Sequence, residues 1–234
     1  MKKNMYVIAL LFTFGAAIGQ EEKQSLLSFA DFEQKFAVAG SNAQILDARS
    51  EEEYRQNHVK GAVNVANEKQ FTALSQQLAK NKPVFVYSIG NGRSGVLAAK
   101  LHRQGFKEVY EFPGGLSKWI GQGKPVESTV GEGLSLVDFN QQIKADQLVL
   151  VDVGSRYCGG CKKLKPIVEE VVAAQSEVLK LVDIEAYENK SLVRELAVEG
   201  LPTLLLYKDE ELVWKKQGQS SKEEILEQVN KFKL

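Results

Sequence analysis

The two cysteines of this chain, Cys158 and Cys161, are separated by two glycines and directly follow an apolar run that predicts a buried strand. Thiols at this spacing, where a strand passes into a helix, can form a reversible disulfide. A zinc site would need further ligands, and the only histidines in the sequence, His58 and His102, fall in a different predicted domain. The pattern therefore favours redox chemistry over metal binding, and we expect neither a metal site nor a cofactor.

The start of the sequence has the features of an export signal. Two lysines precede an apolar stretch at residues 5–18, which at ~1.5 Å per residue is too short to span a bilayer comfortably. Small residues allow cleavage after Gly19, so residues 1–19 are predicted to be a signal peptide, with an uncleaved anchor as the alternative. We expect an exported, periplasmic protein, and in such a compartment an exposed C-x-x-C pair donates, removes or reshuffles disulfides of other proteins.

Net charge and sequence patterning limit the classes of partner and the domain organisation that we expect. The 30 Lys and Arg residues balance the 30 Asp and Glu residues, which argues against nucleic acid as a partner and against strong binding to anionic membranes. Strand-like and helical patterns alternate on both sides of a segment rich in Gly, Pro and polar residues at 121–133. This alternation predicts two α/β units with largely parallel sheets, at 26–126 and 134–234, joined by a linker at 127–133.

In the second unit the cysteines and one acidic residue form a candidate site. Cys158 is expected to begin a helix, where unpaired N–H groups and the helix dipole lower the pKa of a thiol, and Arg156 adds positive charge nearby. Cys161, one turn further, is more buried and suited to resolve a mixed disulfide. Asp152 lies in the preceding apolar strand, where a carboxylate is costly. We expect it to accept the proton of Cys161 with a raised pKa, unless it only ends the strand or caps a neighbouring group.

Residues 134–234 resemble a thioredoxin, and the resemblance rests on five features in matching order. These are the strand with Asp152, the Cys158/Cys161 pair, Pro166, the turn Leu201-Pro202-Thr203 and Gly218. In that family the first cysteine attacks, the second resolves, a buried acid assists and a cis-proline shapes the substrate groove. The resemblance implies these roles for Cys158, Cys161, Asp152 and Pro202, with Leu201, Tyr157, Gly159 and Gly160 at the substrate-binding surface. It also implies a mixed sheet with flanking helices, protein thiols and disulfides as partners and, in an exported protein, a membrane redox partner.

Several positions depart from the thioredoxin pattern. Gly159 and Gly160 replace the familiar Gly-Pro pair, and Tyr157 replaces a tryptophan before the first cysteine. Gly154 replaces a second tryptophan, and Leu181 replaces the lysine that often partners the buried acid. Because residues around the cysteines set thiolate stability, the sequence does not fix the direction of electron flow.

Residues 26–126 resemble a rhodanese (sulfurtransferase-like) domain with a parallel sheet. The matching motifs are Leu46-Asp47-Ala48-Arg49, Glu53-Tyr54, the segment 58–62, the loop 88–94, and the segment 112–116 before Trp119. Active members carry a cysteine at the first loop position, which holds the transferable sulfur, whereas this chain has Ser88. The resemblance therefore implies no sulfurtransferase activity.

The loop itself keeps the length of a sulfurtransferase loop. Gly90 and Gly92 permit a tight cradle of inward-pointing N–H groups, and with Arg93 it could hold sulfate, phosphate or a carboxylate. A relic loop that binds nothing is the alternative.

Three functions follow from these observations. The first is an exported thiol-disulfide oxidoreductase whose rhodanese-like domain is a docking or anion-binding module. The second is a binding protein whose rhodanese-like domain captures an anion or partner, with the thiol pair as a redox switch. The third is a sulfur relay in which Cys158 receives sulfur from an external donor.

Overall fold

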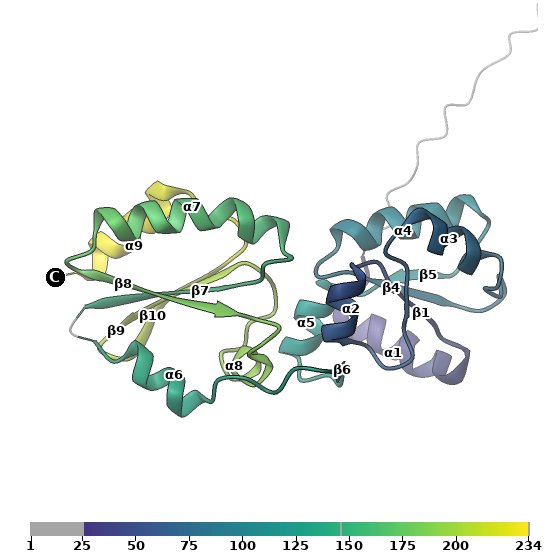
Figure 1. Cartoon of the computed structure of the whole chain (residues 1–234), viewed down its shortest axis with the longest axis horizontal. Coiled ribbons are helices and arrows are strands. Elements are labelled where there is room, and N and C mark those ends of the chain that lie inside the picture. The colour runs from purple at the N-terminus through teal and green to yellow at the C-terminus, as the bar shows by residue number, and fades with distance from the viewer. Residues whose placement is uncertain (1–25, 146, 234) are drawn as a thin grey trace, which may run out of the picture.

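The computed structural model describes residues 26–145 and 147–233. The predicted signal peptide at 1–19 lies outside these residues. Within them, no helix combines the length and the apolar character needed to cross a membrane. The chain forms two α/β units side by side, in agreement with the predicted fold class (Figure 1).

The first unit is built on a parallel sheet of strand order β3-β1-β4-β5. Its strands are β1 (Gln44–Asp47), β3 (Val63–Asn64), β4 (Val84–Tyr87) and β5 (Val109–Glu111). Its helices are α1 (Phe29–Ala39), α2 (Glu51–Gln56), α3 (Glu68–Ser75), α4 (Gly92–Arg103) and α5 (Gly115–Gly121), with a 3-10 turn at Gly40–Asn42. Helices α3 and α4 pack on one face of the sheet around Phe71 and Leu101, and α1 and α5 pack on the other around Phe32 and Trp119.

The second unit has a mixed sheet of strand order β10-β9-β7-β8. Its strands are β7 (Leu148–Gly154), β8 (Leu179–Glu185), β9 (Thr203–Lys208) and β10 (Glu211–Gln217), of which only the β7–β8 pair is parallel. Its helices are α6 (Leu136–Ile143), α7 (Gly159–Ala174), α8 (Lys190–Glu195) and α9 (Lys222–Phe232). The sheet is thus mixed rather than largely parallel, because the hairpin β9–β10 adds two antiparallel pairings.

Local sequence explains where these elements begin. Strand β7 is buried on both faces, as its apolar run, which Asp152 interrupts, predicts. Four helices follow a serine whose hydroxyl accepts a hydrogen bond from the backbone N–H three residues later, which satisfies one of the unpaired donors of a helix start. These serines are Ser28, Ser50, Ser135 and Ser221.

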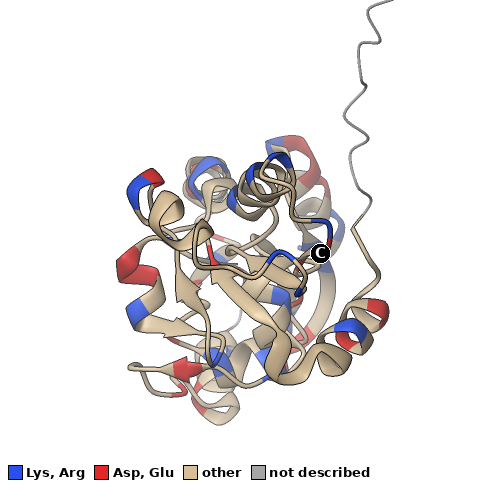
Figure 2. Cartoon of the chain, turned by 90° about the vertical axis from the view of Figure 1, so that its right-hand side faces the viewer, with Lys and Arg blue, Asp and Glu red and all other residues tan. Residues whose placement is uncertain are grey.

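The two units are in direct contact. Helix α5 packs against α8, and one apolar cluster contains residues of both units. Strand β6 (Glu127–Ser128), at the start of the predicted linker, pairs with β2 (Asn57–His58) of the first unit. Figure 2 shows basic and acidic residues interspersed along the ribbon.

Candidate active site

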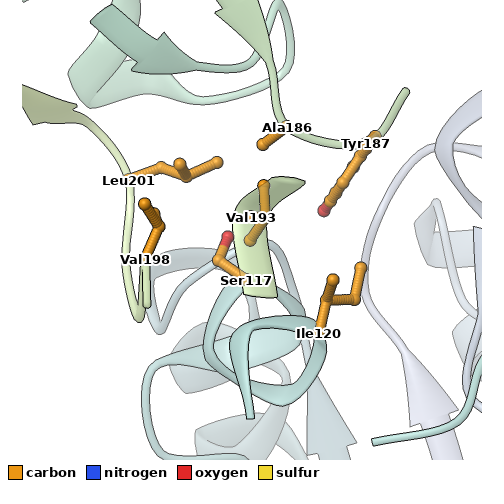
Figure 3. Close-up of a pocket in the computed structure, with 7 residues that line it drawn as sticks. All are labelled: Ser117, Ile120, Ala186, Tyr187, Val193, Val198 and Leu201. Carbon is orange, nitrogen blue, oxygen red and sulfur yellow. The ribbon is translucent and has the colours of Figure 1, made fainter. Parts of the chain in front are cut away.

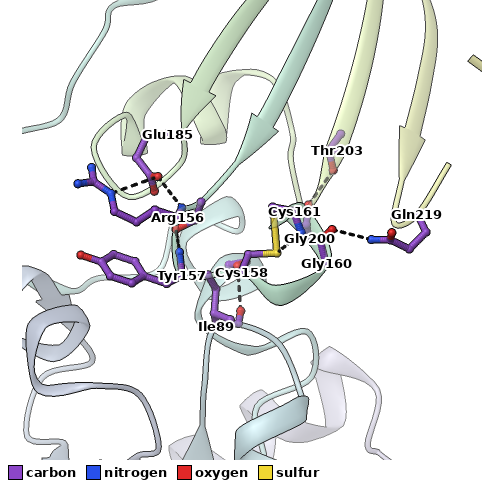
Figure 4. Close-up of a disulfide and its surroundings, with 12 residues drawn as sticks. Ile89, Arg156, Tyr157, Cys158, Gly160, Cys161, Glu185, Gly200, Thr203 and Gln219 are labelled. Carbon is purple, nitrogen blue, oxygen red and sulfur yellow. Dashed lines mark hydrogen bonds and ion pairs between the residues drawn. A yellow bond between two sulfur atoms is a disulfide. The ribbon is translucent and has the colours of Figure 1, made fainter. Parts of the chain in front are cut away.

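Cys158 and Cys161 form a disulfide at the start of α7 (Figure 4). Cys158 is the N-cap residue, and its Sγ accepts a hydrogen bond from the backbone N–H of Cys161 at 3.1 Å. When the pair is reduced, the unpaired backbone N–H groups at the N-terminal end of this 16-residue helix stabilise a thiolate on Cys158. Both cysteines are nearly covered, with exposed fractions of 5% for Cys158 and 7% for Cys161. The prediction that Cys161 is the more buried of the two is therefore wrong, because the disulfide and its surroundings cover both sulfurs.

The turn before β9 lies against this disulfide. The Leu201–Pro202 peptide bond is cis, as the sequence suggested. A Cβ atom added to Gly160 would lie 3.1 Å from Cδ of Pro202 and 3.8 Å from Sγ of Cys158, so the glycine permits this close approach. Gln219 also belongs to the site, because its Nε2 donates to the carbonyl oxygen of Gly160 at 2.9 Å. Sequence reasoning did not identify Gln219, although the neighbouring Gly218 had been noted.

Asp152 lies in β7 with 7% of its surface exposed. Its Oδ1 has no hydrogen-bond partner among the described residues. Burial raises the pKa of this carboxyl to about 6, the nearby Asp183 carboxylate adds to the effect, and Lys165 opposes it. The parallel register pairs Asp152 with Asp183 and places Leu181 opposite Leu150. A carboxylate is therefore the cross-strand neighbour of the buried acid.

Gly154 leaves a space that both Asp152 and Cys161 border. A Cβ atom at this position would lie 3.7 Å from Oδ1 of Asp152 and 3.6 Å from Sγ of Cys161. The carboxyl and the second sulfur thus face a common space, which a larger residue at 154 would fill. This arrangement suits proton transfer between Asp152 and Cys161.

Arg156 does not supply the free positive charge that the sequence suggested. Its guanidinium pairs with Glu185 at 3.6 Å (Figure 4) and also with Glu188. Its side chain is more than half exposed. Two carboxylates and solvent therefore offset its field at Cys158, and the helix N-terminus is the stronger stabiliser of a thiolate.

The loop at Ser88 is closed on itself. The Ser88 hydroxyl donates to the carbonyl oxygen of Gly90 at 2.7 Å and accepts a hydrogen bond from Ser94 N–H at 3.3 Å. The carbonyl oxygen of Gly90 therefore lies where a bound anion would need a hydrogen-bond donor. Arg93 forms two hydrogen bonds to the Glu53 carboxylate, at 2.6 and 2.7 Å. Gly92 begins α4 with open space beside its Cα.

The first unit packs over the thiol pair. Ile89, the residue after Ser88, lies beside Cys158 (Figure 4). The Tyr157 hydroxyl donates to the Glu52 carboxylate at 2.7 Å. Burial and this hydrogen bond raise the pKa of Tyr157 to about 12. The predicted substrate-binding residue Tyr157 is thus engaged by the other unit of the same chain.

Leu201 is engaged in the same way. It lines a small apolar cavity between the units together with Ser117 and Ile120 of α5 (Figure 3). The other lining residues come from the second unit and are Ala186, Tyr187, Val193 and Val198. The guanidinium of Arg49, in the first unit, lies 5.4 Å from the centre of the Tyr187 ring. No sequence pattern pointed to these contacts between the units.

Comparisons with known proteins match both units. The family described as Thioredoxin matches residues 132–231, and the family described as Rhodanese-like domain matches residues 31–122. Thioredoxin from Listeria monocytogenes is 36% identical over 92 residues, which cover 39% of this chain and 89% of that protein. Thioredoxin from Bacillus subtilis is 37% identical over 87 residues, covering 37% of this chain and 84% of that protein. Among solved structures, a mutant thioredoxin from Halobacterium salinarum aligns with a TM-score of 0.40 at 25% identity, covering 44% of this chain and 88% of that chain.

Proposed function

Because the chain belongs to the thioredoxin family and carries a rhodanese-like domain before its thioredoxin domain, we propose that it is a thiol-disulfide oxidoreductase acting on protein thiols and disulfides. One observation carries the proposal. The Cys158–Cys161 disulfide lies at the start of α7, beside the cis-Pro202 turn and with Asp152 behind it. This arrangement combines a nucleophile, a resolving thiol and a proton acceptor.

In the reducing direction, the Cys158 thiolate attacks one sulfur of a substrate disulfide. A mixed disulfide forms, and the other substrate sulfur leaves as a thiolate that takes up a proton. Cys161 then loses its proton and attacks the Cys158 sulfur, which releases the second substrate sulfur and closes the disulfide of the enzyme. The pair is oxidised by two electrons, and the substrate is reduced to a dithiol. The same steps in reverse oxidise a substrate dithiol.

Asp152 takes the proton of Cys161 during the resolving step. Its raised pKa of about 6 lies close to neutrality, so the carboxyl can both accept and return a proton at physiological pH. Its position near Cys161, across the space at Gly154, supports this role.

The rhodanese-like domain acts as a docking module without sulfurtransferase activity. Support comes from Ser88 at the position where active members carry cysteine and from the closed loop around it. The contacts of Tyr157 and Leu201 with the first unit support docking of this domain onto the thiol-bearing domain of the same chain. The anion-binding alternative gains no support from Arg93, whose guanidinium is held by Glu53.

The protein acts after export, with a membrane redox partner that renews its thiol or disulfide state. The lysines and the apolar run at residues 2–18 support this part of the proposal. Mass spectrometry of the protein from a periplasmic fraction should show a mature chain that begins at Gln20. A cytoplasmic chain that retains residues 1–19 would contradict it.

The exchange mechanism predicts that Cys161→Ser traps substrates. Without the resolving thiol, the mixed disulfide at Cys158 persists and runs as a higher-mass species on non-reducing gels. Cys158→Ser is the matched control and should trap far less, because its remaining thiol is deeper in the helix. Equal trapping by both variants, or by neither, would contradict the assigned order of attack.

The direction of exchange follows from the reduction potential of the pair. Equilibration with glutathione or dithiothreitol should place it on the family scale, where about −270 mV marks a reductase and about −120 mV a disulfide donor.

A further inference from the structure

The rhodanese-like domain covers the surface through which the thioredoxin domain would bind a protein. Cys158 has an exposed fraction of only 5%, and Pro202 is buried. Ile89 lies beside Cys158, and α5 lines the apolar cavity next to Leu201, which stays partly exposed (Figures 3 and 4). Gly159, the residue after Cys158, is exposed, and this exposed edge of the disulfide is the opening at Gly159.

Polar contacts around the covered surface hold the domains together. Tyr157 donates to Glu52, and Lys118 of α5 lies 3.2 Å from the Glu199 carboxylate, which also accepts from Gln122. The backbones of the two domains approach each other closely at Gly121, the last residue of α5. A Cβ atom there would lie 2.1 Å from the carbonyl oxygen of Val198.

The linker is fixed in the same closed arrangement. Lys190 at the start of α8 is 2% exposed, and its ammonium group donates to the carbonyl oxygens of Val130 and Gly131 at 3.1 and 2.5 Å. Arg194, one turn further, pairs with Glu132 at 2.7 Å. These bonds tie the linker to the second domain, and the pairing of β6 with β2 ties its start to the first domain, so the linker is anchored on both sides.

Resting on the proposed function, we propose that the rhodanese-like domain determines the substrate class of the thiol pair. While the domains are joined, the opening at Gly159 admits small-molecule thiols and disulfides and excludes protein disulfides. A protein substrate reaches Cys158 only when the domains separate, because its chain needs the surface at Tyr157 and Leu201 that the first domain occupies. The observed rate with protein substrates therefore scales with the fraction of separated molecules.

Gly121→Gln is the variant that separates the domains. Its backbone is not in the left-handed region, so the helix itself tolerates a side chain, but the close approach to Val198 does not. Gly95→Ala is the matched control. It also places a side chain on a helical glycine of the first domain, and its Cβ meets only the Glu111 carboxylate, at 3.5 Å. Small-angle X-ray scattering reports whether each variant is extended.

The first readout is independent of enzymatic activity. In a Cys161→Ser background, Cys158 is the only thiol and is alkylated either by N-ethylmaleimide or by a maleimide carrying a poly(ethylene glycol) chain. Gly121→Gln should raise the ratio of the polymer rate to the small-reagent rate by about tenfold, and Gly95→Ala should leave it unchanged. The proposal would be overturned if Cys161→Ser with an otherwise unaltered interface already showed the same ratio as a Gly121→Gln variant that scattering shows to be extended.

A charge-reversal pair provides a second route to separation if Gly121→Gln stays compact. Lys118→Glu opposes Glu199, and the double variant Lys118→Glu/Glu199→Lys restores attraction with the charges exchanged. The ratio of the polymer rate to the small-reagent rate should rise in Lys118→Glu and should return to the value of the unaltered interface in the double variant. An unchanged ratio in single variants shown by scattering to be extended would again overturn the proposal.

Activity then distinguishes the two proposals. With both cysteines present, wild type should reduce hydroxyethyl disulfide but act slowly on the disulfides of insulin, and Gly121→Gln should accelerate the insulin reaction selectively. If both substrates react equally well in wild type and in Gly121→Gln, the substrate restriction is wrong and the oxidoreductase stands. If no variant reduces or oxidises any disulfide while the ratio of the two alkylation rates responds as expected, the proposed function is wrong. The conclusion that the first domain restricts access to Cys158 is then retained.

Discussion

The carboxyl group of Asp152 changes its protonation between folded and unfolded states. Its pKa is raised from 3.8 to about 6, first by burial and then by Asp183, so the folded protein binds this proton more tightly than the unfolded chain. The stability of the fold therefore falls as the pH rises from about 4 to about 6, and the loss is complete above that window.

We expect Asp152→Asn to remove this loss. The variant should gain about 3 kcal/mol over wild type at pH 7.5 and show none of that gain at pH 4, because a shift of about two pKa units corresponds to this free energy. Urea unfolding of the oxidised proteins at both pH values measures it. Asp183→Asn keeps the buried acid and removes the neighbouring charge, so it should move the midpoint of the pH dependence to a lower value. A stability difference that does not vary with pH would contradict the raised pKa.

At the scale of elements, the loop between β4 and α4 predicts the outcome of restoring the missing thiol. Ser88→Cys should gain no thiosulfate:cyanide sulfurtransferase activity. A thiolate at this position would meet the carbonyl oxygen of Gly90, which lies 2.7 Å from the present hydroxyl, and would have one N–H donor, that of Ser94. A colorimetric thiocyanate assay on the folded variant tests this expectation.

Packing of the second domain against the loop is a competing explanation for an inactive Ser88→Cys variant, and a double variant tests it. The double variant Ser88→Cys/Gly121→Gln opens the domains and makes no further change in the loop. It should also be inactive if the loop geometry is the cause. Activity in the double variant alone would assign the block to the cover, and activity in the single variant would show that only the thiol had been lost.

The elements that sequence predicted well are those encoded by short spacings. The apolar strand before Cys158, the helix that begins at this cysteine and the turn at Pro202 each depend on neighbouring residues, and the structure has all three. The contacts that escaped prediction join distant positions. Tyr157 and Glu52 are 105 residues apart, and the partners of Arg156 are set by how β8 ends, so no local pattern marks either contact.

At the scale of the whole molecule, the shared apolar cluster makes the two domains one cooperative unit. Phe32 and Trp119 of the first domain belong to the same cluster as Tyr187 and Val198 of the second, so unfolding either domain exposes apolar surface on the other. Adjacent domains with a small polar contact unfold independently, whereas a continuous apolar contact couples them.

Calorimetry of wild type should therefore show one transition whose calorimetric and van't Hoff enthalpies agree. Gly121→Gln, which forces α5 away from Val198, should split it into two transitions, because each domain keeps its own sheet and loses the shared contact. Gly95→Ala should retain a single transition. Two separate transitions in wild type would mean that the cluster does not couple the domains, and the closed arrangement would then be too weak to restrict access to Cys158.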